Sequence, residues 1–185
     1  GYKLKRNAKG EVIITSAGLP ARPSEIEYVA CAFPDWEGAF NTSLRFKNWS
    51  FSMQWDGKVG GMTYSQSHHK MCEQGHLAET LNGRKPGTSL YLDIADPDVL
   101  KLFEKQKITP VAGVYCIAPG VVDNGDGTYS PNQKLVTLES YYKEYYRIGN
   151  VETNTFSTTY LKLREVRLDY QLPKSWLKNT FINNA

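Results

Sequence analysis

The stretch that decides the fold is residues 39–56, which read AFNTSLRFKNWSFSMQWD. Bulky apolar side chains occupy even positions from Phe40 to Phe46 and odd positions from Trp49 to Trp55. A period of two is the repeat of a β-strand, because successive side chains point to opposite faces of a sheet. The change of parity needs two residues between the runs. Lys47-Asn48 supplies them, and asparagine readily takes the positive φ of a tight turn. The stretch therefore predicts a β-hairpin with one apolar face.

Residues 160–172 predict a further strand. Its second half alternates apolar and polar residues up to Pro173, which cannot donate a hydrogen bond to a ladder and so ends the strand. Leu161 and Leu163 keep the opposite parity. A β-bulge near Arg164-Glu165 would bring both halves into phase, and we expect one there.

The long connection over residues 57–155 does not read as regular sheet. It contains five prolines, which indicates a decorated loop held by the strands. Asp96-Pro97 predicts the start of a short helix, and a second short helix is expected over residues 138–146. Near the N-terminus, residues 11–15 predict half of a smaller hairpin.

Composition narrows the class of protein. The 185 residues are 41% hydrophobic, which excludes disordered and collagen-like chains, and the net charge of +3 is too small to indicate a nucleic-acid surface. No apolar run reaches about 18 residues, so neither a membrane-spanning helix nor a signal peptide in residues 1–25 is expected. Cys31, Cys72 and Cys116 are odd in number and widely spaced, which argues against a disulfide framework.

Two interpretations fit an apolar hairpin face. One is the core of a soluble β-rich module that binds carbohydrate; the other is the lipid-facing wall of an outer-membrane β-barrel. Aromatic residues gather toward the ends of the predicted strands, and a short turn contrasts with a very long connection, as is typical of such barrels. In a barrel, the polar face of the hairpin would line a water-filled lumen.

Short motifs follow one another along the chain in an order that resembles a known family. In the first third they are Gly1-Tyr2, Arg6-Asn7, Gly10-Glu11-Val12-Ile13, Gly18-Leu19-Pro20, Pro34-Asp35-Trp36-Glu37-Gly38, Asn41, Phe46-Lys47, Phe51-Ser52, Asp56 and Gly60-Gly61. Further along they are Glu79-Thr80-Leu81, Gly83-Arg84, Gly120-Val121-Val122-Asp123, Pro131-Asn132, the run from Tyr160 to Val166, Tyr170 and Leu172-Pro173-Lys174. This order resembles the C-terminal barrel region of the SusC/RagA family of TonB-dependent (TonB-linked) outer-membrane transporters.

The resemblance implies a mainly β fold, made of antiparallel strands of a partial outer-membrane β-barrel and a long loop with short helices. Residues 1–185 would belong to the barrel domain, with strands at about 39–56 and 160–172 and an extracellular loop at about 57–155. It also implies a fragment, because family members carry a signal peptide, a plug domain and a barrel of about 22 strands.

The function implied by the resemblance is nutrient uptake across the outer membrane of a Gram-negative, Bacteroidetes-like bacterium. The substrate would be an oligosaccharide or a peptide, the partners a SusD-like surface lipoprotein and, through the absent plug region, TonB. Transmembrane β-strands would contact outer-membrane lipid, and glycan utilisation is the expected process. No cofactor, nucleic-acid partner or enzymatic activity is expected, and the sequence contains no GxSxG, phosphate-binding glycine loop or HExxH motif.

Three further clusters have a plain structural interpretation. His68, Cys72 and His76 are spaced i, i+4 and i+8, and the span of about 12 Å along a helix is too long for one ion to bind all three. His69 and Glu73 could complete a smaller set of ligands. We expect no metal site, and a zinc enzyme using His68, His76 and Glu73 ranks as the last alternative.

The run Asp123-Asn124-Gly125-Asp126-Gly127 predicts a turn, since the twelfth position from Asp123 is Lys134 and not a calcium-binding Glu. The helix with Tyr141, Tyr142, Tyr145 and Tyr146 is expected to pack on the loop, with sugar stacking as the alternative.

Overall fold

The computed structural model describes residues 1–178 of a mainly β protein, with 35% of the chain in strands and 20% in helices. The chain divides into two compact units. One unit, here called the loop unit, comprises residues 1–29 and 64–156; the other, the strand unit, comprises residues 30–63 and the chain from residue 157 onward. None of the helices in residues 1–178 has the length and apolar character needed to cross a membrane.

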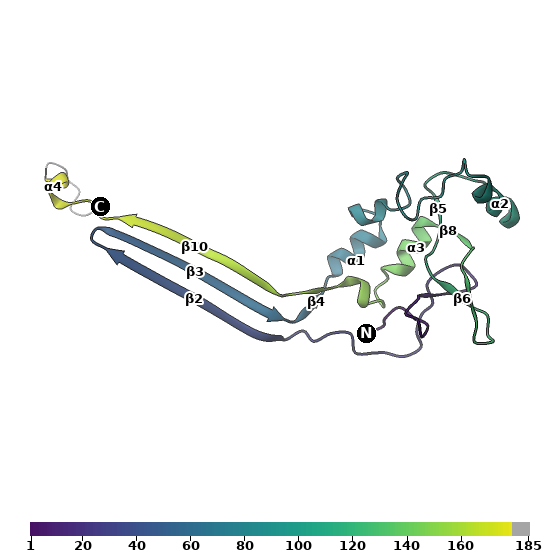
Figure 1. Cartoon of the computed structure of the whole chain (residues 1–185), viewed down its shortest axis with the longest axis horizontal. Helices are drawn as coiled ribbons and strands as arrows, with labels where there is room; N and C mark the ends of the chain where they lie inside the picture. Colours follow the sequence, from purple (N-terminus) through teal and green to yellow (C-terminus); the bar gives the residue numbers. More distant parts are fainter. Residues whose placement is uncertain (179–185) are drawn as a thin grey trace. The chain divides into compact units, whose positions relative to one another are not determined.

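The strand unit is built on a three-stranded antiparallel sheet (Figure 1). Its strands are β2 (Pro34–Phe46), β3 (Trp49–Gly60) and β10 (Tyr160–Tyr170), in the order β10-β3-β2. The predicted hairpin is confirmed, with Phe40 opposite Trp55 and Leu44 opposite Phe51. The strands extend beyond the predicted residues 39–56. The run from Pro34 to Gly38 also belongs to β2, although its apolar and polar residues do not alternate clearly enough to predict a strand. β10 ends two residues earlier than expected.

The turn of the hairpin differs from the prediction in one backbone angle. Lys47 takes the positive φ, 51°, and Asn48 does not. The side-chain Nδ2 of Asn48 instead donates to the backbone oxygen of Gln171, at 2.9 Å. The Asn48 side chain therefore links the turn to the residue after β10, and Lys47 is the turn residue with the left-handed backbone conformation.

The β-bulge in β10 is confirmed. The register with β3 shifts between Leu163 and Glu165, so that Leu163 lies opposite Trp55 and Val166 opposite Met53. Because one residue is left over, side chains of odd number before the bulge and of even number after it point to the same face. All three strands thus present their apolar residues on one side of the sheet.

The loop unit contains two further sheets and most of the helices. Its short strands are β1 (Ile13–Ile14), β5 (Tyr115–Ile117), β6 (Val121–Asp123), β7 (Tyr129–Pro131) and β8 (Leu135–Thr137). Its helices are α1 (Gln66–Glu73), α2 (Pro97–Gln106) and α3 (Leu138–Tyr145), with 3-10 turns η1 (Ala78–Leu81) and η2 (Glu152–Asn154). The pair β4 (Met62–Tyr64) and β9 (Thr155–Ser157) forms a two-stranded sheet, and α4 (Lys174–Leu177) follows β10.

The loop unit has a hydrophobic core of its own. Its buried members are Ile14, Leu90, Cys116, Ala118, Val136, Leu138, Tyr141 and Tyr142. Residues 57–155 are therefore more than a decorated loop, because they enclose this core together with the N-terminal residues. The expected small hairpin is only partly present: Arg6 bridges Val12 antiparallel, but β1 itself pairs in parallel with β6.

Both predicted helices form where local signals placed them. The Asp96 side chain caps α2 by accepting the N–H of Asp98 at 2.9 Å, and Lys107 ends the helix in the left-handed conformation. α3 begins after Thr137, whose hydroxyl accepts the N–H of Ser140 at 3.2 Å. These caps satisfy backbone groups that have no partner within the helix.

Candidate functional site

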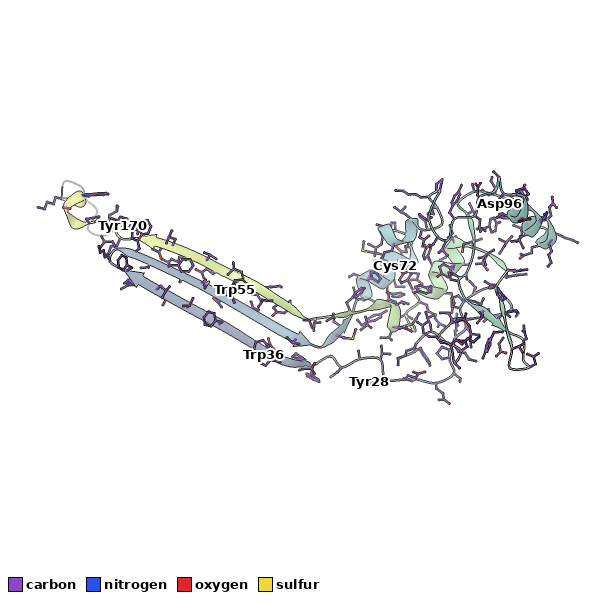
Figure 2. The ribbon with its side chains drawn as sticks, in the orientation of Figure 1. Tyr28, Trp36, Trp55, Cys72, Asp96 and Tyr170 are labelled. Carbon is purple, nitrogen blue, oxygen red and sulfur yellow. The ribbon has the colours of Figure 1, made fainter. Side chains whose placement is uncertain are left out.

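The first candidate site is the apolar face of the three-stranded sheet. Figure 2 labels Trp36, Trp55 and Tyr170, one on each strand. Eight large side chains of this face are more than half exposed: Trp36, Phe40, Leu44, Phe46, Val59, Leu161, Val166 and Leu168. Monomeric proteins in water rarely expose so much contiguous apolar surface. Exposed patches of this kind are typical of surfaces that contact a membrane or another protein.

The opposite face of the same sheet is polar and carries an ion pair. Arg164, the bulge residue, binds Asp56 through two nitrogens, one of which donates to Oδ2 at 2.9 Å. The hydroxyl of Tyr160 donates to the same carboxylate at 2.9 Å. The bulge thus places its arginine with the polar residues of β3, so that the apolar face carries no charge at this point.

A second candidate site lies in the loop unit, where α1 and η1 meet. The Ser65 hydroxyl caps α1 by accepting the N–H of His68 at 3.1 Å. His68 and Cys72 are four residues apart on this helix and therefore lie on one face. Gly75, with a φ of 76°, turns the chain back, and η1 then brings the carboxylate of Glu79 to both side chains.

Three potential ligand atoms meet at this point. His68 Nε2 lies 3.5 Å from Cys72 Sγ and 3.3 Å from Glu79 Oε2, and the sulfur and this oxygen are 4.0 Å apart. The hydroxyl of Tyr146, which follows α3, donates to the same Oε2 at 3.1 Å. Burial, followed by the nearby carboxylate of Glu79, raises the pKa of the Cys72 thiol to about 11. Burial therefore favours the neutral thiol over the thiolate.

The predicted spacing of ligands is only partly realised. α1 ends at Glu73, so His76 lies beyond the helix and outside the group formed by His68 and Cys72. Sequence reasoning missed Glu79, because a carboxylate seven residues beyond Cys72 carries no periodic signal. The turn at Gly75 was the one feature that could have indicated the return of the chain.

His69 and Glu73, the other residues of the proposed ligand set, form a separate pair. The His69 ring is buried, and its Nε2 lies 3.5 Å from Glu73 Oε2 without hydrogen-bond geometry. Burial lowers the pKa of His69. Glu73 is engaged by Lys70, whose Nζ donates to Oε2 at 2.7 Å. These residues therefore do not converge on His68.

The tyrosines of α3 pack as expected. Tyr141 and Tyr142 are buried in the core, and Tyr145 and Tyr146 pack against it. The Tyr142 hydroxyl donates to the backbone oxygen of Asn82 at 2.7 Å and so ties α3 to the residue after η1. These contacts pack the helix onto the core of the loop unit.

The acidic run after β6 forms a turn, as predicted. Asp123 Oδ1 accepts the N–H of Gly125, and Asp126 Oδ1 accepts the N–H of Thr128, both at 2.9 Å. The two carboxylates therefore cap backbone groups of their own turn.

Comparison of the chain with models of known protein families finds no match, and comparison with curated proteins finds none either.

Proposed function

We propose that this chain forms part of the wall and an outer loop of a TonB-dependent outer-membrane transporter of the SusC/RagA type. Such a transporter imports oligosaccharides or peptides together with a SusD-like lipoprotein. The observation that carries the proposal is the exposed apolar face of the three-stranded sheet. Water-soluble monomers rarely leave an apolar face of this size uncovered, whereas lipid covers such a face in a membrane barrel.

The size of the face supports the proposal. Along β2 it extends from Trp36 to Phe46, which corresponds to about 34 Å of strand. Strands of membrane barrels are tilted by about 45°, so this length spans about 24 Å along the membrane normal. The apolar band of outer-membrane barrels is about 25 Å tall.

The distribution of aromatic residues supports it further. Trp36 lies at one end of the face, and Trp49 and Tyr170 lie together at the other, with ring centroids 4.6 Å apart. Phe40, Trp55 and Leu163 lie across the middle of the face, and Leu44, Phe51 and Leu168 form the row next to Trp49 and Tyr170, so Trp55 lies away from both ends. Tryptophan and tyrosine favour the two membrane–water interfaces, and aliphatic residues favour the hydrocarbon between them.

The polar face fits a solvated lumen. Ser50, Ser52 and Gln54 occupy every second position of β3 on this face, followed by Asp56, which pairs with Arg164. In a barrel these groups face water, where an exposed ion pair is inexpensive. The proposal requires that β2 and β10 each pair with a further strand, because lipid does not tolerate unpaired backbone groups.

The loop unit would then supply part of the outer vestibule or of the contact with the lipoprotein. In this proposal the part of residues 57–155 that follows β3 lies on the extracellular side of an outer membrane of a Bacteroidetes-like bacterium. The chain acts by transport and not by catalysis, and it needs no cofactor for this role.

A pair of neighbouring substitutions tests the proposal. Phe51 and Ser52 lie on opposite faces of β3, so Phe51→Arg places a charge toward lipid and Ser52→Arg places it toward the lumen. A charge on the lipid face costs about 2–4 kcal/mol at the bilayer midplane and less toward the interfaces, so Phe51, between the midplane and Trp49, falls within this range or below it. After cell fractionation of strains carrying the full-length gene, we expect the parent and Ser52→Arg proteins in the outer membrane and much less of the Phe51→Arg protein.

The opposite result has a defined meaning. Recovery of the parent protein in the soluble fraction would contradict the transporter. It would favour a soluble β-rich carbohydrate-binding module in which Trp49, Phe51 and Trp55 are packed together. If the Phe51→Arg and Ser52→Arg proteins were lost equally from the outer-membrane fraction, the face with Phe51 would not be the one that contacts lipid, which would also contradict the proposal.

A further inference from the structure

The geometry of His68, Cys72 and Glu79 matches that of a tetrahedral zinc site. With zinc bonds of about 2.3 Å to sulfur and 2.0 Å to nitrogen or oxygen, tetrahedral angles place sulfur and nitrogen about 3.5 Å apart and nitrogen and oxygen about 3.3 Å apart. The corresponding distances here are 3.5 Å and 3.3 Å. The third side, from Sγ to Oε2, is 4.0 Å, against about 3.5 Å in an ideal site. The Glu79 side chain is 57% exposed, so a small rotation of it can shorten the distance from Sγ to Oε2.

The imidazole of His68 is oriented as a ligand. Its Nδ1 lies 3.0 Å from Oδ1 of Asn154, a fully buried residue. The amide orientation of Asn154 is fixed, because its Nδ2 donates to the backbone oxygens of Tyr146 and Asn150 at 3.1 and 3.2 Å. Oδ1 therefore accepts a hydrogen bond from the N–H of Nδ1, and in the neutral imidazole the lone pair of Nε2 is then directed at Cys72 and Glu79. Metal-binding histidines almost always have such a partner on the other nitrogen.

The ring is also held in place by its neighbours. Phe156 and Tyr146 contact it edge to face, with centroids 4.8 and 5.5 Å away. The Ser65 N–H donates to the backbone oxygen of Asn154 at 2.8 Å and so fixes the start of α1 to η2. The positions of the imidazole and of the helix that carries Cys72 are thus set before any ion binds.

With this tautomer the cluster lacks positive charge. The Nε2 lone pair and the Glu79 carboxylate are both acceptors, and the thiol of Cys72 has one proton for the two of them. Tyr146 satisfies Oε2 in part. A single cation between the three atoms would satisfy all of them at once.

We propose that His68 Nε2, Cys72 Sγ and Glu79 Oε2 bind one Zn²⁺ ion, with a water molecule in the fourth position. Binding displaces the thiol proton to solvent, so that one thiolate and one carboxylate balance the two charges of the ion. Thiolate and imidazole select zinc over the hard ions magnesium and calcium. The site joins α1, η1 and η2 within the loop unit. It goes beyond the proposed transport function and does not depend on it.

The test uses the full 185-residue chain purified in detergent. After saturation with zinc and dialysis, we expect one zinc per chain by elemental analysis. With Co²⁺ in place of zinc, we expect a thiolate-to-cobalt charge-transfer absorption, which reports the sulfur directly. Circular dichroism confirms that each variant is folded.

Four variants locate the site. We expect Cys72→Ser to abolish the charge-transfer band and to weaken zinc binding by more than about 100-fold, which exceeds the 10–100-fold typical of an outer-shell residue. Glu79→Gln, at an exposed position that does not threaten folding, should weaken binding and keep the band. The matched controls are Cys31→Ser and His76→Gln, both at exposed positions, and they should bind zinc as the parent does.

Several outcomes would overturn the proposal. These are a chain that retains no zinc, a cobalt complex without the sulfur band, or a control variant that loses zinc as completely as Cys72→Ser. Each can occur whether or not the sheet resides in an outer membrane. Failure of the zinc site and failure of the transport proposal are therefore distinguishable.

Discussion

Among single residues, Glu144 forms a two-point ion pair with Arg22 within the loop unit. Its carboxylate accepts two hydrogen bonds from Arg22, at 2.6 and 2.7 Å, while only 15% of the Glu144 side chain is exposed. The hydrogen bonds from the Arg22 guanidinium hold the pKa of Glu144 below its usual value of 4.5. The folded chain therefore gains stability from this group above pH 4.5, and loses it as the pH falls through the lowered pKa.

We expect Glu144→Gln to lower the free energy of unfolding of the loop unit by about 1 kcal/mol at pH 7, because Arg22 is largely exposed and the pair is partly screened. The variant should also lose less stability than the parent between pH 5 and pH 3. Hydrogen exchange of the α3 amides measures both effects. Glu139→Gln, at an exposed position on the same helix, is the control. Equal pH dependence in parent and Glu144→Gln proteins would contradict the assignment.

The hydroxyl of Tyr142 gives a second prediction. It is buried and donates to the backbone oxygen of Asn82 at 2.7 Å. Tyr142→Phe leaves that oxygen without this donor and should cost about 1–2 kcal/mol of stability, measured by the same hydrogen exchange. Tyr129→Phe, at an exposed tyrosine, should cost less than about 0.5 kcal/mol. If both substitutions had the same effect, the hydrogen bond would not be the cause.

At the level of elements, the bulge sets the phase of β10. Deleting Arg164 makes it impossible to keep the pairing on both sides, because a slip of one residue moves every side chain to the other face. Two engineered cysteine pairs, in a chain in which Cys31 is replaced, report the register of β10 with β3. The pair at positions 52 and 167 reports the pairing after the bulge, and the pair at positions 56 and 162 reports the pairing before it. We expect both pairs to form disulfides with Arg164→Ala and only one pair to do so in the deletion. Formation of both pairs in the deletion would show that the bulge is dispensable.

Local signals account for the elements that the sequence could predict. The hairpin, the bulge and the capped helix α2 each follow from residues close together in the chain. The parallel pairing of Ile13 with Val121 could not be predicted, because strands of two or three residues carry no period. Glu79 was missed for a related reason: its approach to His68 depends on a turn and not on a repeat.

At the level of the whole molecule, the two units differ in the exposure of their apolar side chains. In the loop unit Ile14 is 1% exposed, whereas Leu168 in the sheet is 65% exposed. Burial of such a side chain contributes about 1.5–3 kcal/mol, and a sheet that leaves many of them exposed lacks this contribution in water. This difference supports the proposal that the sheet is a membrane wall and the loop unit a separately packed body.

Two substitutions should therefore have separate effects. Ile14→Ala removes a side chain from the core of the loop unit and should destabilise it by about 2–5 kcal/mol, seen as faster hydrogen exchange in α3. The sheet should be unaffected, and tryptophan fluorescence reports it selectively, because Trp36, Trp49, Trp55 and Trp176 all lie in the strand unit. Phe51→Arg should do the reverse in lipid vesicles, with altered fluorescence and unchanged exchange in α3. If Ile14→Ala shifted the fluorescence as strongly as Phe51→Arg, the two units would share one folding transition, and lipid alone would not account for the stability of the sheet.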